Sequence, residues 1–344
     1  MSVSAKTLTM VWLAAVAVTI PAAIAQKSYI AGGVAGEITE TSVTSLWRAP
    51  KDIPSENLFY GRGGQEHAPH GPFTFESEDL DGSNPKYDVR DADGVKWKIK
   101  LGVEARPETA ASRFVWAVGY HTDEDYFLPN VQVNGMPAHV HRGQDLIEPG
   151  GVMRNVRLKR EGGKKVGNWS WRDNPFAGTR ELDGLRVMMA VLNNWDLKEE
   201  NNAIRDFKKG DENGDTREYE VSDLGASFGT TGRELSHTKS KGNLYSYARS
   251  TFIKKVGPTT VDFDVPSRPE MIVAFNPHEY FSRVGMKWIG DDIPRQTARW
   301  IGDLLGQLSQ DQIRDAFRAA GYEGLDMDEF AVEFQKRVKE LQGL

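Results

Sequence analysis

Two short stretches decide which fold this sequence predicts: residues 195–201, W-D-L-K-E-E-N, and residues 221–225, V-S-D-L-G. The first follows a run with helical apolar spacing, and the second closes a run with the alternation of a strand. Each places an acidic side chain where regular structure is expected to end. Carboxylate and amide oxygens are ligands for hard divalent cations, and a positioned carboxylate can accept the proton of a hydroxyl. The two stretches are therefore candidates for metal binding and for proton transfer.

The region upstream has the pattern of a small antiparallel sheet. Residues 73–77, 86–90 and 95–101 alternate apolar and polar side chains, and short turns rich in Asp, Gly and Asn join them. A helix follows, with Pro107 in its first turn and Gly119 at its end. This order predicts a three-stranded meander followed by one helix.

Residues 97–100, W-K-I-K, lie on the third of these strands, and Glu108 lies in the helix that follows. Together with the two loops, this order of motifs resembles that of the protein kinases. The resemblance covers about residues 72–230 and is closest to divergent, atypical members of the kinase-like superfamily. It implies an α+β, bilobal protein-kinase-like fold, in which a β-rich N-lobe with one helix precedes a mostly helical C-lobe.

The resemblance also implies roles for individual side chains. Asp196 would accept the proton of an attacking hydroxyl, and Asn201 and Asp223 would hold Mg or Mn. Lys100 would meet the α- and β-phosphates of ATP or of another nucleotide, and Glu108 would hold that lysine in place. The expected partners are this nucleotide and a hydroxyl acceptor, an unknown protein or small molecule.

A polar turn between the first two strands lies where the family has its phosphate-covering loop. Gly82, Ser83 and Asn84 would bind the nucleotide there. Gly225 would permit the turn that aims Asp223.

The sequence departs from the family pattern at several points. Asn194 and Trp195 replace the His-Arg that precedes the catalytic aspartate, the covering loop has a single glycine, and no A-P-E-like stretch follows. Asn202 remains an alternative to Asn201 as the metal ligand. Lys98, on the same strand face as Lys100, remains an alternative at the phosphates.

These departures leave two other functions open. A pseudokinase would keep the lobes and bind ligands without catalysis. A secreted serine hydrolase is the other alternative, because residues 225–229, G-A-S-F-G, match a nucleophile elbow with Ser227 at its centre. Asp262 and His278 follow in the order that such an enzyme requires.

The N-terminus has the features of an export signal. Lys6 precedes an apolar stretch over residues 8–20, and A-I-A at residues 23–25 is a typical cleavage site. We therefore expect a secreted or periplasmic protein, with no stable membrane span after cleavage.

Four segments are expected along the chain. They are a signal peptide (residues 1–25), an extended N-terminal arm (26–71), the N-lobe with its nucleotide-covering sheet and helix (72–161) and the helical C-lobe with the catalytic and metal loops (162–344).

Composition excludes several classes of function. The chain of 344 residues has no Cys, which rules out thiol catalysis and Cys-ligated zinc or iron–sulfur clusters. It has 43 basic and 49 acidic residues, a formal net charge of −6, so a general nucleic-acid partner is not expected.

Overall fold

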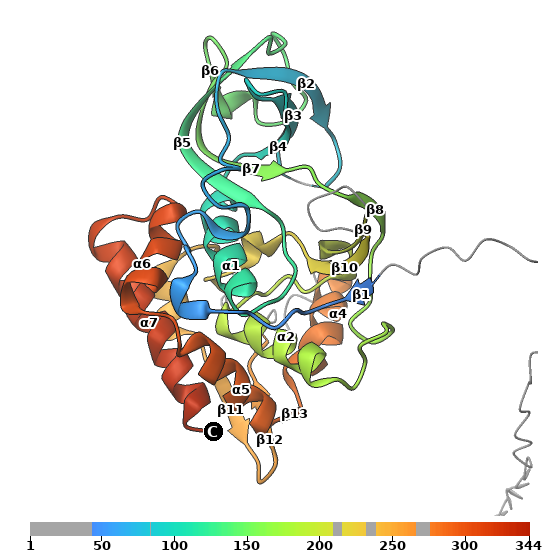
Figure 1. Ribbon diagram of the computed structural model, residues 1–344, viewed down its shortest axis with the longest axis vertical. Helices are drawn as coiled ribbons and strands as arrows, with labels where there is room; N and C mark the ends of the chain where they lie inside the picture. Colours follow the sequence, from blue (N-terminus) through green and yellow to red (C-terminus); the bar gives the residue numbers. More distant parts are fainter. Residues whose placement is uncertain (1–42, 83, 209–214, 232–238, 266–275) are drawn as a thin grey trace, which may run out of the picture. The chain divides into compact units, whose positions relative to one another are not determined.

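The structure is a computed structural model, and it describes residues 43–82, 84–208, 215–231, 239–265 and 276–344. Residues Ser42–Leu344 form one compact unit of mixed α and β structure. Within this unit, the strands between residues 73 and 160 build one sheet, and most helices come from the second half of the chain (Figure 1). The predicted signal peptide lies outside the described residues.

No helix in the described part of the chain combines the length and the apolarity that crossing a membrane requires.

The first sheet closes into a small barrel. Its strands are β2 (Phe73–Asp79), β3 (Lys86–Arg90), β4 (Lys96–Lys100), β5 (Asp125–Asn134), β6 (Ile147–Glu148) and β7 (Val152–Arg160). The predicted meander is present as the antiparallel strands β2, β3 and β4. Strand β2 also pairs in parallel with β5, β5 pairs with β7, and β7 pairs with β4. Five strands therefore close on themselves, which removes the open edges that a meander alone would leave.

Strand alternation places the candidate lysines on the outside of this barrel. Trp97 and Ile99 on β4 are buried in the barrel core, where Ile99 is paired with Leu158 of β7. Because successive side chains point to opposite faces, Lys98 and Lys100 share the other face of the strand. That face turns toward the second half of the chain.

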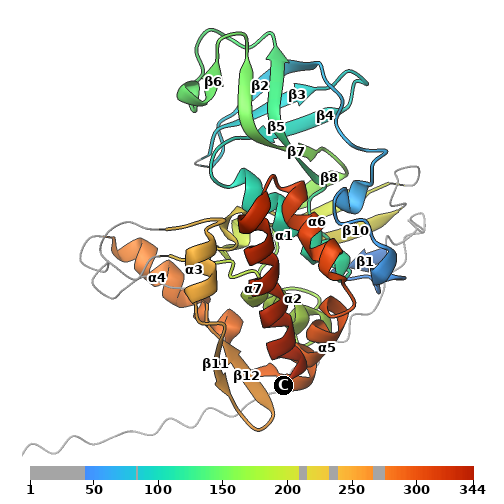
Figure 2. The same cartoon turned by 90° about the vertical axis from the view of Figure 1, so that its left-hand side faces the viewer.

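Helix α1 (Ala105–Ala117) follows the barrel in sequence but packs with the C-terminal helices. Its buried residues join the core of the second half, where the ring of Phe114 stacks on Phe334 at 3.9 Å. In Figure 2, α1 lies beside α6 and α7. Gly119 ends the helix as predicted, with φ of 94°. A Cβ there would lie 2.1 Å from the carbonyl oxygen of Arg48, so glycine is required at this position.

The second half of the chain supplies the other helices. They are α2 (Arg180–Val191), α3 (Leu244–Arg249), α4 (Pro277–Met286), α5 (Arg295–Leu305), α6 (Gln310–Ala319) and α7 (Gly324–Gln342). Side-chain caps begin two of them: Thr179 accepts the N–H of Leu182 at the start of α2, and Ser309 and Gln312 make a reciprocal capping box at the start of α6. Short 3-10 turns are η1 (Ile53–Ser55), η2 (Gly61–Gly63), η3 (Gln144–Leu146), η4 (Glu199–Asn201), η5 (Leu224–Ala226) and η7 (Lys287–Gly290).

Two further sheets make the second half less helical than the sequence predicts. One has the order β1-β10-β9-β8, and the other has the order β11-β12-β13. Their bounds are β1 (Val43–Ser45), β8 (Lys164–Gly167), β9 (Asn202–Phe207), β10 (Thr216–Val221), β11 (Ile253–Val256), β12 (Thr260–Phe263) and β13 (Ile293–Pro294). The hairpin of β9 and β10 lies between the two candidate metal ligands, Asn201 before β9 and Asp223 after β10.

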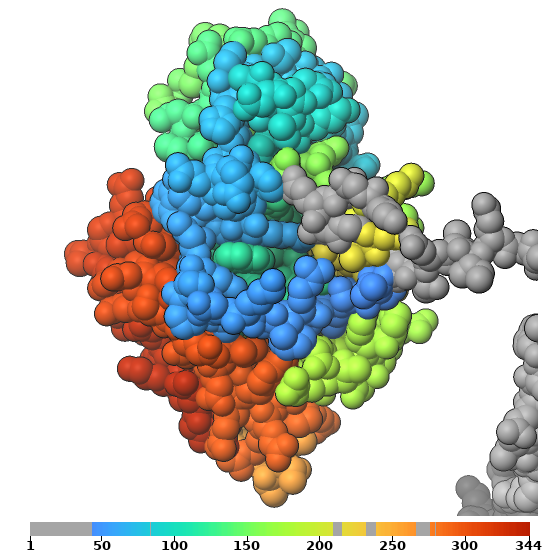
Figure 3. All heavy atoms as spheres, in the orientation of Figure 1, coloured from blue at the N-terminus to red at the C-terminus, as the bar shows by residue number. Residues whose placement is uncertain are grey.

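The segment predicted as an extended arm is irregular, but its described part is packed. Leu46, Ile53 and Leu58 are buried in the same core as the C-terminal helices, and β1 pairs with β10. The blue atoms of this segment form a band across the middle of the face seen in Figure 3. Apolar side chains spaced along an irregular chain bury as well as those of a helix, and the sequence pattern does not reveal this.

The packing of α1 predicts a large effect of Phe114→Ala. The side chain is fully buried, so its removal should lower the free energy of unfolding by about 3–5 kcal/mol. Urea denaturation checks this, with Val332→Ala on the exposed face of α7 as the control, expected to change stability by less than about 0.5 kcal/mol. Equal effects of the two substitutions would mean that α1 is not anchored through Phe114.

Candidate functional site

The predicted site residues line one cleft of about 1240 Å³ between the barrel and the second half of the chain. Seven of them contribute to its walls: Gly82, Asn84, Lys100, Glu108, Asp196, Asn201 and Asp223. Ser83 lies outside the described residues. Residues as far apart in sequence as Gly82 and Asp223 thus line the same cleft.

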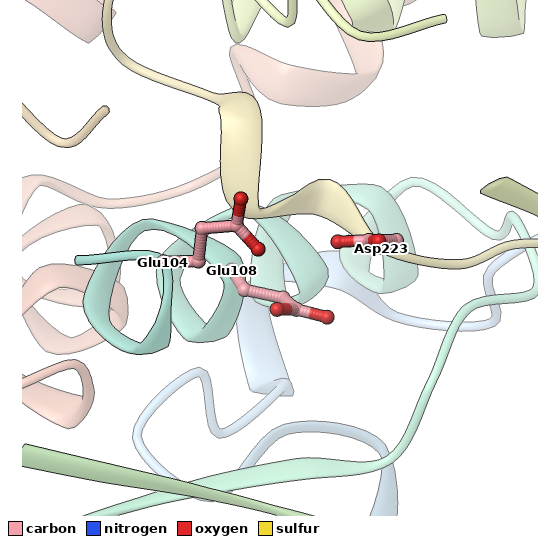
Figure 4. A group of neighbouring side chains, drawn as sticks. All are labelled: Glu104, Glu108 and Asp223. Carbon is pink, nitrogen blue, oxygen red and sulfur yellow. The ribbon is translucent and has the colours of Figure 1, made fainter. Parts of the chain in front are cut away.

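Lys100 lies at the centre of a cluster of carboxylates. Its Nζ is 2.8 Å from Oε2 of Glu108, 2.6 Å from Oδ1 of Asp223 and 2.7 Å from Oε2 of Glu104. Glu104 immediately precedes α1 and Glu108 lies in its first turn, whereas Asp223 approaches from the segment after β10 (Figure 4). The ion pair between Lys100 and Glu108 that the sequence predicts is present, and two further acids share its cation.

Two more cations balance these three carboxylates. Arg157 on β7 donates from Nη2 to Oε1 of Glu108 at 2.6 Å, so each oxygen of that carboxylate has its own cation. Lys241 donates to Oε1 of Glu104. Three positive and three negative groups thus occupy a largely buried volume, where an unpaired charge would be strongly unfavourable.

These pairings shift the ionisation of their members. Burial alone would lower the pKa of Lys100, but attraction to Glu108, Asp223 and Glu104 raises it well above its usual value. Burial would raise the pKa of Glu104, but the positive charges of Lys100 and Lys241 outweigh it and hold the pKa at about 2. Both groups are therefore charged at neutral pH.

Sequence reasoning missed Glu104, Lys241 and Arg157. A signal for Glu104 existed: it lies four residues after Lys100 and four before Glu108, and like charges at such spacing repel unless a cation lies between them. No comparable signal marks Lys241 or Arg157, because their approach depends on the tertiary fold.

An antiparallel hairpin explains the spacing of the two predicted loops. Strands β9 and β10 pair Asn202 with Val221, so the residues just before β9 and just after β10 are neighbours. The N–H of Ser222 accordingly donates to the carbonyl oxygen of Asn201 at 2.9 Å. Asp223 then takes a left-handed conformation, with φ of 52°, which is unusual for a residue with a side chain.

The local contacts distinguish Asn201 from Asn202. Asn201 lines the cleft, and its side-chain nitrogen donates to the carbonyl oxygen of Asp196 at 2.7 Å. This bond fixes the amide and leaves its Oδ1 as the atom that can serve a cation. The side chain of Asn202 is buried and donates to the carbonyl oxygen of Trp169. Asn201 is therefore the better candidate ligand.

Asp196 has a basic partner that sequence reasoning missed. Arg283 on α4 donates from Nη1 to Oδ1 of Asp196 at 2.9 Å and also binds the carbonyl oxygen of Trp195. The Arg283 guanidinium lies over the ring of Trp195, with its Cζ 4.8 Å from the ring centroid. Lys198 lies 3.6 Å from the same oxygen of Asp196. Arg283 is 87 residues from Asp196, so no local pattern could indicate it.

Lys98 and Gly225 have roles other than those considered from the sequence. Lys98 is paired with Asp79 and Asp88, each at 2.8 Å, so Lys100 is the lysine in the carboxylate cluster. Gly225 does not adopt the positive φ of a tight glycine turn. A Cβ at Gly225 would instead lie 2.6 Å from Cβ of Glu104, so the missing side chain gives Glu104 its room.

The contacts of Ser227 do not favour a hydrolase. Its side chain is fully buried, and Oγ has no hydrogen-bond partner among the described residues. His278 lines the cleft, whereas Ser227 does not, and Asp262 accepts the N–H of Asp292 in a different part of the fold. A buried serine outside the cleft is poorly placed to attack a substrate.

No family model matches this chain, and no curated protein matches it in sequence. Two kinases are among the solved structures that match. One is the proinflammatory kinase CtkA of Helicobacter pylori, with a TM-score of 0.44 and 8% identity, over 78% of this chain and 95% of that chain. The other is the MAP kinase LmaMPK10 of Leishmania major, with a TM-score of 0.22 and 11% identity, over 79% and 94%. Both TM-scores lie below 0.5, so the function proposed below rests on the geometry of the cleft.

Removing the shared cation should destabilise the protein. Lys100→Met leaves three carboxylates facing one another and should lower the free energy of unfolding by about 3–5 kcal/mol. The double variant Lys100→Met/Glu108→Gln should recover part of this loss, because one repelling charge is gone. Urea unfolding measures both, with the exposed Lys96→Met on the same strand as the control. If Lys100→Met behaved like Lys96→Met, the cluster would not contribute to stability.

Asp125, behind the cluster, should make stability depend on pH. Burial raises its pKa to about 7; Arg157 opposes this shift, and repulsion from Glu108 adds to it. The folded state therefore holds a proton that the unfolded chain releases near pH 4, so stability falls as pH rises from about 4 to about 7.

Asp125→Asn cannot ionise, so its stability relative to wild type should rise over that interval and then level off. Urea unfolding at several pH values tests this, with the exposed Asp93→Asn as a control. Parallel pH profiles for Asp125→Asn and wild type would contradict the assignment.

Proposed function

We propose that this chain is an exported kinase-like protein that binds a nucleotide with a divalent metal and transfers a phosphoryl group to a hydroxyl acceptor. The observation that carries the proposal is the simultaneous contact of Lys100 with Glu108 and Asp223, in a cleft that Asp196 and Asn201 also line. Phosphoryl transfer depends mainly on positioning and on neutralising charge, and this set of groups provides both. Export is proposed from the N-terminal sequence alone.

The barrel side of the cleft suits a nucleoside triphosphate. Lys100 is charged, is fixed by a glutamate whose other oxygen is held by Arg157, and lies near the turn that contains Gly82 and Asn84. An ammonium held in this way meets phosphate oxygens with little loss of side-chain entropy. The identity of the base is left open, as ATP or another nucleotide.

The donor set across the cleft suits Mg or Mn. Oδ1 of Asn201 and the half-exposed carboxylate of Asp223 are hard oxygen ligands, and the hairpin of β9 and β10 brings them together. A cation bound there would supply the charge neutralisation that the triphosphate requires. Asn201 is oriented for this by its bond to the backbone of Asp196.

Asp196 is proposed as the proton acceptor. The acceptor hydroxyl oxygen forms a bond to the terminal phosphorus while the bond from that phosphorus to its bridging oxygen breaks. The nucleoside diphosphate leaves with the electron pair of that bond, and the hydroxyl proton passes to Asp196. Arg283 and Lys198 bind one carboxylate oxygen, Oδ1, which directs the other toward the substrate. The arrangement orients the carboxylate and restrains its motion.

A non-catalytic binding protein is the second candidate. Lys100 is 3% exposed and already has three carboxylate partners, so a phosphate must replace one of them before it can bind. A chain that keeps this closed arrangement would bind a ligand without transferring a phosphoryl group.

Metal and nucleotide should stabilise the wild-type protein together. Mg²⁺ or Mn²⁺ with ATP at about a hundred times the dissociation constant should add about 2.7 kcal/mol, measured by thermal unfolding. Asp223→Ala should abolish this gain, because it removes the anionic metal ligand. Asp173→Ala, exposed and outside the cleft, is the control.

Asp196→Ala should separate binding from transfer. It should keep most of the stabilisation by metal and nucleotide but lower the transfer rate by about 10²–10⁴-fold. Transfer of labelled phosphate from the nucleotide to an acceptor measures this rate. A wild-type protein that is stabilised but never transfers would support the binding protein, and one that neither metal nor nucleotide stabilises would exclude both candidates.

A further inference from the structure

Glu104 is held by three donors from three separate parts of the fold. Its Oε2 accepts from Nζ of Lys100 at 2.7 Å and from Nδ2 of Asn84 at 2.5 Å, and its Oε1 accepts from Nζ of Lys241. Asn84 belongs to the turn between β2 and β3, Lys100 to β4, and Lys241 to the segment after Asp223. All four side chains line the cleft.

A role of Glu104 in capping α1 does not explain this arrangement. Glu104 is the residue before α1, yet among the described residues its side chain makes no capping hydrogen bond to the helix. Its carboxylate is directed instead to the two ammonium groups and the amide, and Gly225 leaves the space in which it lies. The side chain is 7% exposed, so the donors enclose it.

Two ammonium groups and an amide N–H that converge on one anion make a donor set that also suits a phosphate group. We infer that Lys100, Lys241 and Asn84 form a phosphate subsite of the proposed nucleotide site, and that the carboxylate of Glu104 occupies it as an internal competitor until a ligand phosphate replaces it. This inference rests on the proposed function for the identity of the ligand as a nucleotide. The low pKa of Glu104 supports it, because the competitor is then an anion at every physiological pH.

Glu108 and Asp223, the other two acids of the cluster, are less easily displaced from Lys100 than Glu104. Both oxygens of Glu108 have a cation, Lys100 on one side and Arg157 on the other, and its side chain is 1% exposed. Asp223 is the proposed metal ligand. Glu104 can leave by rotating its side chain alone, because the aromatic packing of Phe114 keeps α1 in place.

Competition between Glu104 and a ligand phosphate lowers the apparent affinity of this subsite for the ligand. A ligand phosphate must compete with a carboxylate that is always present. The apparent affinity is therefore the intrinsic affinity multiplied by the fraction of molecules in which Glu104 has left the subsite. Lys241 follows Asp223 in the sequence, whereas Asn84 and Lys100 belong to the barrel. A phosphate bound by all three would therefore connect the segment that contains Lys241 to the barrel.

Inorganic tripolyphosphate tests the subsite without a nucleoside. Its binding to the full chain is measured by titration calorimetry for wild type, Glu104→Gln, Lys241→Met and the control Glu148→Gln, an exposed glutamate paired with Arg154. We expect Glu104→Gln to bind at least about tenfold more tightly than wild type, because its competitor is neutral. Lys241→Met should bind about tenfold more weakly, and Glu148→Gln should match wild type.

Tripolyphosphate binding by Glu104→Gln that is no tighter than by wild type overturns the inference. If this variant does not fold, Glu104→Asp takes its place: the shorter side chain reaches the donors less well, so a smaller gain in the same direction is expected. No gain with Glu104→Asp would then overturn the inference.

The same variants titrated with ATP and Mg²⁺ separate this inference from the proposed function. Tighter tripolyphosphate binding by Glu104→Gln without any nucleotide binding would support the subsite and contradict the nucleotide. Equal binding of ATP with Mg²⁺ by wild type and Glu104→Gln would support the nucleotide and contradict the internal competitor.

Discussion

The ion pair between Lys100 and Glu108 joins the two halves of this molecule. Lys100 is on the last strand of the meander, and its neighbours Trp97 and Ile99 belong to the barrel core. Glu108 is on a helix whose apolar residues belong to the other core, with the C-terminal helices. The contact therefore lies where two independently packed cores meet, and the cleft forms around it. A charged contact at such a boundary fixes the relative position of the two cores more specifically than apolar packing, because its geometry is directional.

This boundary also concentrates charge and backbone strain. Three acids and three bases balance there, and Asp223 holds a left-handed backbone conformation beside them. The left-handed backbone of Asp223 costs stability, and such strain persists where the surrounding structure determines it. The rigid anchoring of α1 through Phe114, Phe317 and Phe334 supplies that determination. Glu108 is thus already in place for Lys100.

Local patterns in the sequence predicted much of the fold. Alternation located the strands at residues 86–90 and 95–101, and Pro107 and Gly119 located the helix that follows them, because each of these features depends on neighbours a few residues apart. Closure of the barrel was not predictable in this way. It depends on β2 pairing in parallel with β5 and on β4 pairing with β7, which join strands about 60 residues apart and leave no local signature.

The same distinction holds for the site. The order of motifs that resembles the protein kinases indicated Asp196, Asn201 and Asp223, as well as Lys100 and Glu108. Their spacing is local: a hairpin separates the first three, and a strand and the helix after it carry the other two. Arg283 and Lys241 could not be found in this way, since each reaches the cleft from a segment remote from its partner.

The central claim is that one cleft holds nucleotide phosphates and a metal together. The most direct test is a crystal structure of the protein with Mg²⁺ and a non-hydrolysable ATP analogue. We expect the triphosphate against Lys100 and the metal on Asn201 and Asp223, with the terminal phosphate facing Asp196. A nucleotide bound elsewhere, or a cleft that stays closed around Glu104 at saturating analogue, would contradict it.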